Sequence, residues 1–293
     1  MDNSTNQSKF EGTYKIKYMK NLKYFLFVPG IAVLALFSNC KPDPEPKLAG
    51  KIQIAFEHFV DGDTAIYDQM VYTNGAGNQW ELSEIQWFLS ELTLHKKDGG
   101  TYKISKSVES HYVDTDIPSS FTWKPEDSVD VGDYESISFV FGFRGEKNIP
   151  FMFVNPPESQ MFWPYSLGGD SGGYHYMKLN GFWKDTVQFR RAFNFHLGVG
   201  QYQDENGNRP TDDDGKYFFV QNWFTLTIPA NFKIEDSITT EITLRMNIEK
   251  WFITPYVYNH NVWGPDIMEN QKAMNMVKEN GFDVFTISKI LNK

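Results

Sequence analysis

Alternation of large apolar side chains with polar or small ones restricts the fold of this chain more than any other feature. Two segments show it most clearly, with Ile52, Ile54, Phe56 and His58 in residues 51–59, and Ile137, Phe139, Phe141 and Phe143 in residues 135–143. Successive side chains of a strand point to opposite faces, so each segment is predicted to be a strand with one buried face. Aromatic residues make up 16% of the chain, which also favours strands.

Turn-forming residues separate these segments from other strand-like ones. Residues 92–104 predict a hairpin whose turn is Lys97-Asp98-Gly99-Gly100. Further strands are expected at residues 174–179, 189–197, 217–228 and 238–248. The predicted fold class is therefore all-β: an antiparallel β-sandwich or a partly closed barrel with small helical decorations.

Two segments have helical spacing instead. Leu82–Leu92 places Ile85, Phe88 and Leu89 as a helix would, although this segment is expected to become a strand before Leu94. Residues 266–280 carry apolar residues at helical spacing and end at Asn-Gly, a typical helix stop. A helix is therefore predicted in each segment.

The start of the chain predicts export. A basic segment at residues 19–23 precedes an apolar run of 14 residues, Tyr24–Phe37. Such a run is short for a membrane-spanning helix and typical of a signal peptide. Residues 1–39 are thus predicted to be an N-terminal extension and a lipoprotein signal peptide, with translation starting at Met19.

Cys40, the only cysteine, follows the apolar run after Ser38 and Asn39. A single cysteine excludes an intramolecular disulfide, and this position is that of the acylated cysteine of bacterial lipoproteins. The alternative is a free thiol in an uncleaved anchor. Prolines alternate after Cys40, so residues 40–50 are predicted to be a lipidated, semi-rigid tether.

Residues 51–290 are predicted to form one β domain outside the cytoplasm. After removal of residues 1–39, the chain has 23 basic and 35 acidic residues, a formal charge of −12. This acidic balance disfavours binding to nucleic acid. The chain also lacks the common catalytic and phosphate-binding signatures, so no enzymatic activity is predicted.

The histidines are the candidate metal ligands. Only six occur, and those flanked by aromatic residues in strand-like segments are His58, His111 and His196. Imidazoles that converge from different strands bind copper or zinc without any cysteine. The alternative is that each is a buried histidine bonded to a backbone carbonyl or a carboxylate, because a single histidine reveals no geometry.

A series of segments resembles a known family. These segments are Ile54–His58, Ile85–Leu94, His111–Asp114, Gly132–Phe143, Met161–Trp163, Gly173–Gly181, Phe195–Gly198 and Asn280–Phe285. In this order they are similar to the MbnP-like proteins, the methanobactin-associated copper-binding family of bacterial envelopes. The resemblance spans residues 51–287.

The resemblance implies a β-rich fold and a copper site similar to two histidines with a tryptophan oxidised to kynurenine by a partner di-haem peroxidase-like enzyme. It makes His196 the first ligand candidate, followed by His58 and His111. In a family member with a kynurenine ligand, the tryptophan stands two residues before a histidine. None of the eight tryptophans here has that spacing, and Trp163 is expected to pack in the core.

Together these features predict a copper-binding envelope lipoprotein without catalysis, anchored through Cys40, most simply to the outer membrane and facing the periplasm or the surface. The alternative is a surface ligand-binding or adhesion module for a glycan or peptide, with structural histidines and no metal.

Overall fold

The computed structural model describes residues 47–105, 109–163, 172–201, 206, 208–215, 218–268 and 270–293. The predicted signal peptide (residues 1–39), Cys40 and the tether as far as residue 46 lie outside the described residues. The first strand begins at Ala49, inside the predicted tether, and residues from Pro46 to Lys293 form one compact unit.

The first sheet is built around strand β1, in which every second side chain from Ile52 to Val60 is buried. Its strand order is β16-β15-β1-β2, and two short strands pair with β1 off this path. β1 and β15 run parallel, and the other pairs are antiparallel. The strands are β1 (Ala49–Val60), β2 (Asp63–Thr64), β7 (Thr122–Trp123), β8 (Val129–Asp130), β15 (Thr239–Asn247) and β16 (Phe285–Asn292).

The second sheet is antiparallel and has the order β11-β10-β4-β9-β14, with three short strands paired to β4. A two-stranded sheet stands apart from it. The strands are β3 (Tyr72–Thr73), β4 (Gln79–Lys96), β5 (Thr101–Lys103), β6 (Ser110–Asp114), β9 (Gly132–Phe141), β10 (Met177–Lys184), β11 (Arg190–Leu197), β14 (Phe224–Ile234), and the separate pair β12 (Gly200–Gln201) and β13 (Phe219–Val220).

Aromatic side chains fill the space between the two main sheets. The Trp87 ring on β4 lies 5.5 Å from Phe56 on β1 and 5.2 Å from Phe285 on β16. Two sheets that bury their facing aromatic side chains make a sandwich. The prediction of an all-β sandwich with small helices is confirmed.

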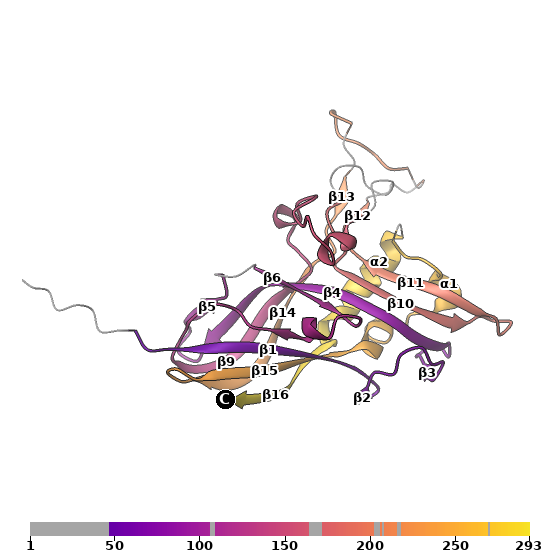
Figure 1. The fold of residues 1–293 in the computed structure, drawn as a ribbon. Coiled ribbons are helices and arrows are strands. Elements are labelled where there is room, and N and C mark those ends of the chain that lie inside the picture. Colours follow the sequence, from indigo (N-terminus) through magenta and orange to yellow (C-terminus); the bar gives the residue numbers. More distant parts are fainter. Residues whose placement is uncertain are drawn as a thin grey trace, which may run out of the picture. The chain divides into compact units, whose positions relative to one another are not determined.

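The helices are short. They are η1 (Pro118–Phe121), η2 (Gly145–Lys147), η3 (Glu158–Met161), η6 (Ile248–Phe252), η7 (Gly281–Asp283), α1 (His260–Trp263) and α2 (Gln271–Asn280). Figure 1 shows α1 and α2 at the β10–β11 end of the second sheet. The helix predicted from residue 266 begins at Gln271, where the Asn270 side chain accepts the Ala273 N–H, and it ends at Asn280 as expected.

The helix predicted for Leu82–Leu92 is wrong, because this segment lies within the long strand β4. Both faces of β4 are covered here. Trp87 faces the first sheet, whereas Phe88 packs on the other side against the rings of Phe143 and Phe153. Apolar residues on both faces of a buried strand mimic helical spacing, and this similarity caused the error.

Among the described residues, no helix is both long enough and apolar enough to cross a membrane.

Candidate functional site

Polar side chains form two rows across the outer face of the second sheet, the face turned away from the first sheet. The first row runs through Asp114 on β6, Gln86 on β4, Lys178 on β10 and His196 on β11, which are register partners in that order. The second row runs through Glu84, Asn180 and Asn194. Their neighbours along the strands point into the core, since side chains of a strand alternate between faces.

His196 is held at the end of the first row by a chain of hydrogen bonds. The Asn180 amide Nδ2 donates to Glu84 Oε2 at 3.0 Å, so Asn180 Oδ1 accepts from His196 Nε2 at 2.7 Å. This network assigns the proton of the neutral ring to Nε2. The other nitrogen, His196 Nδ1, is buried and has no hydrogen-bond partner in the structure. It presents an unshared lone pair.

His175 lies two residues before the start of β10 and shows the same pattern. Its Nδ1 donates to the Met161 carbonyl at 2.9 Å, and its backbone N–H donates to the same oxygen at 2.7 Å. His175 Nε2 is therefore unprotonated in the neutral ring, and it too is buried without a partner. The centroids of the His175 and His196 rings are 5.2 Å apart, and the ring planes are nearly perpendicular at 86°.

Burial keeps both rings neutral. It lowers the pKa of His175 well below its ordinary value, and His196 and the Lys178 ammonium lower it further. Burial, helped by Lys178, also lowers the pKa of His196 to about 3. The site thus offers two neutral imidazoles, each with one free lone pair, in a place that water reaches poorly.

Trp163 covers one side of this pair. Its ring lies 4.6 Å from that of His175, and the residue is almost fully buried, as predicted for a core tryptophan. Gly198 makes this position possible, because a Cβ at residue 198 would lie 2.3 Å from a Trp163 ring carbon. Residues of the Met161–Trp163 and Phe195–Gly198 segments therefore pack together around His175 and His196.

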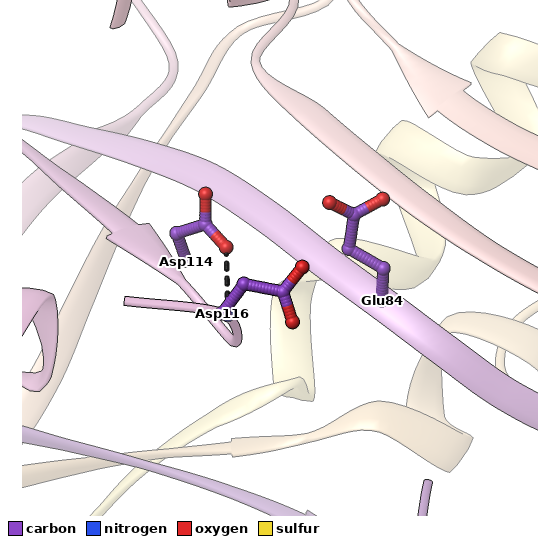
Figure 2. Close-up of side chains that lie close together, drawn as sticks. All are labelled: Glu84, Asp114 and Asp116. Carbon is purple, nitrogen blue, oxygen red and sulfur yellow. Dashed lines mark hydrogen bonds between the residues drawn. The ribbon is translucent and has the colours of Figure 1, made fainter. Parts of the chain in front are cut away.

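Three carboxylates gather at the other end of the polar rows. Figure 2 shows Glu84 on β4 beside Asp114 on β6 and Asp116 in the following turn, and one oxygen from each lies within 4.8 Å of the others. It is the one such acidic or histidine group of three within the described ranges. Asp114 already accepts hydrogen bonds from the Tyr112 hydroxyl at 2.6 Å and the Asp116 N–H at 2.8 Å. Asp114 is thus held by neighbouring donors.

The other two predicted ligands face the core between the sheets. His58 accepts a hydrogen bond at Nε2 from Trp87 Nε1 at 3.0 Å, and its Nδ1 lies 3.0 Å from the Tyr67 hydroxyl. Both nitrogens of His58 are therefore engaged. Burial lowers the pKa of this ring to about 3.

His111 donates from Nε2 to the Ser120 carbonyl at 2.7 Å, and its ring stacks between Phe56 and Trp123. Burial also lowers its pKa. The structure thus places His196 on the outer face of the sheet, away from the inward-facing His58 and His111. It brings His196 together with His175, which sequence analysis did not select.

A family model described as MbnP matches residues 49–274. The solved structure titled MbnP from Methylosinus trichosporium is similar with a TM-score of 0.42 and 11% identity, over 66% of this chain and 75% of that one. No curated protein matches the chain.

Proposed function

Since the chain belongs to the MbnP family, we propose that it is a bacterial envelope lipoprotein that binds copper through His175 and His196 and does not catalyse a reaction. The observation that carries this proposal is the pair of buried ring nitrogens, His175 Nε2 and His196 Nδ1, that have no hydrogen-bond partner. A buried acceptor without a donor is costly, and because the two rings are adjacent, a single ion that accepts both lone pairs would remove this cost from both of them.

The donor set fits copper. Neutral imidazoles suit copper and zinc, whereas calcium and magnesium take oxygen ligands. Zinc in structural sites is held by four ligands, and the described side chains around the two rings supply only these two free nitrogens. A bound copper ion would accept one electron pair from each of these two nitrogens.

The surroundings position the rings as metal ligands are normally positioned. Metal-bound histidines donate their other N–H to a carbonyl or carboxylate, which fixes the ring and its tautomer. Here the Met161 carbonyl holds His175, and Asn180, backed by Glu84, holds His196. The Trp163 indole excludes water from one side of His175.

Export and anchoring through Cys40 complete the proposal. They are supported by the basic segment, the apolar run Tyr24–Phe37 and the position of Cys40 three residues after the end of that run. The anchor is proposed to hold the domain at the outer membrane. A di-haem peroxidase-like partner is also proposed, and only the family resemblance supports it.

Copper titration of the purified protein tests the ligand pair. His175→Ala and His196→Ala should each lose most of the Cu(I) affinity, because each removes one of two donors. His58→Ala and His111→Ala should bind copper like the wild type but unfold at a lower temperature, because these rings fill the core. His95→Gln is the matched control, since His95 lies on β4 and bonds Ser138.

Full copper affinity in both His175→Ala and His196→Ala would refute the proposed ligand pair. Loss of copper binding in His58→Ala or His111→Ala, with the fold intact, would show that the copper site lies in the core instead.

The second candidate function is a ligand-binding or adhesion module without a metal. A cavity of about 630 Å³ beside β6, η1 and β7 favours it, because its wall combines aromatic and polar side chains that suit a glycan or peptide: Phe88, Tyr112, Trp123, Phe153, Ser119 and Glu158. Elemental analysis of natively purified protein separates the two functions. Stoichiometric copper supports the first, and a metal-free protein that binds glycans and loses them in Phe153→Ala supports the second.

A further inference from the structure

Lys178 is the cation of the polar rows, and its strand pairing and one hydrogen bond fix its place. On β10 it is the register partner of His196 on β11, so the two side chains share the outer face. Its Nζ donates to the Gln160 carbonyl at 2.7 Å. The next carbonyl, that of Met161, accepts from His175 Nδ1. One short segment, η3, therefore holds both Lys178 and His175.

The charge of Lys178 reaches both rings. It lowers the pKa of His196 and, after burial and His196 itself, that of His175. Burial lowers the pKa of the Lys178 ammonium, and Glu84 and Asp114, on the other side of Lys178, oppose that shift. These carboxylates favour the charged form of the lysine and offset part of its field. Lys178 thus stands between the ring pair on one side and the carboxylate group of Glu84, Asp114 and Asp116 on the other.

An ammonium beside a metal site repels a doubly charged ion twice as strongly as a singly charged one, because Coulomb energy scales with the product of the charges. We propose that Lys178 is a specificity-determining residue that makes the His175–His196 site prefer Cu(I) over Cu(II). This inference rests on the proposed function and adds a role for a residue that contacts neither lone pair.

The expected size of the effect is about tenfold in the ratio of the two dissociation constants. It follows from one unit of charge acting at side-chain distance across a strand pair at an effective dielectric constant near 20, reduced by the two carboxylates. Tenfold corresponds to about 59 mV in the potential of a one-electron couple. Burial of the rings keeps this interaction from being screened by salt.

The test measures Cu(I) and Cu(II) affinities separately, with competing chelators of known affinity, on the full protein domain. Lys178→Met should strengthen Cu(II) binding about tenfold relative to Cu(I), whereas Lys178→Arg, which keeps the charge, should leave the ratio unchanged. Glu84→Gln should shift the ratio in the opposite direction, toward Cu(I). Lys184→Met is the matched control, because Lys184 lies on the same face of β10 but pairs with Arg190.

Thermal unfolding is recorded for every variant, because Lys178 also donates to Gln160. A parallel fall of both affinities in Lys178→Met, with an unchanged ratio, would show a purely structural role and overturn the inference. The same shift in Lys184→Met would overturn it as well. If His175→Ala and His196→Ala lose copper binding but Lys178→Met leaves the ratio of the Cu(I) and Cu(II) affinities unchanged, only this inference fails. If they keep copper, the proposed function fails with it.

Discussion

His260 offers the cleanest test of what burial does to a histidine in this fold. Its side chain is about 1% exposed, and its ring stacks on Phe193 with centroids 4.5 Å apart. Neither ring nitrogen has a hydrogen-bond partner within the described structure. Burial lowers its pKa to about 3. The substitution His260→Phe keeps an aromatic ring in this place and removes the titrating group.

The sign of the pH effect follows from proton uptake. Between pH 6.5 and about 3, the unfolded chain binds a proton at His260 that the folded chain does not, so the stability contribution of the neutral ring falls as the pH falls through this window. From pH 7.5 to pH 5 the loss is about 2 kcal/mol for one histidine with an unfolded pKa of 6.5. The His260→Phe variant has no titrating group at this position, so it does not lose this stability as the pH falls.

The assay is urea unfolding of wild type and His260→Phe at pH 7.5 and pH 5. The stability of the variant relative to wild type should increase by about 2 kcal/mol on going to pH 5. Phe193→Leu, a change in the same aromatic cluster without a titrating group, should shift stability equally at both pH values. A difference between wild type and His260→Phe that does not change with pH would refute the reasoning.

Three further predictions concern other parts of the chain. Trp87→Phe removes the donor to His58 Nε2 and should cost about 1–3 kcal/mol in chemical denaturation; an unchanged midpoint would contradict it. Gly198→Ala should lower the melting temperature and weaken copper binding, because the new Cβ displaces Trp163, whereas Gly75→Ala, whose Cβ meets only Val257 at 3.4 Å, should do neither. Cys40→Ser should move the protein from the membrane to the soluble fraction, and a wild type that lacks an acyl group in mass spectrometry would exclude the anchor.

Local patterns were sufficient to predict most of the long strands, but not β16. Period-two alternation located β1, β9 and β15 to within a few residues, because each buries one face and exposes the other. The hairpin turn at residues 97–100 was also predicted correctly, since two glycines allow the backbone to reverse there. The error at Leu82–Leu92 arose where a second aromatic layer covers the outer face of β4, which no local pattern reveals.

The same alternation contained information about the histidines. His58 shares its parity with the buried Phe56, which places it in the core. His196 stands between Phe195 and Leu197, whose side chains point inward, so its own ring lies on the other face. Their positions in the alternation thus place His196 on the outer face of its sheet and His58 in the core, although both histidines are next to a phenylalanine in the sequence.

The sequence by itself determined the β architecture, the family and the expectation of export, because these depend on residue spacing and on the order of short segments along the chain. Only the tertiary structure decided which histidines meet. His175 and His196 are 21 positions apart, and they become neighbours because β10 and β11 pair in one register while η3 accepts the His175 N–H. Ligand geometry, tautomer and the nearby charge of Lys178 depend on this long-range pairing, and no periodicity within one segment encodes it.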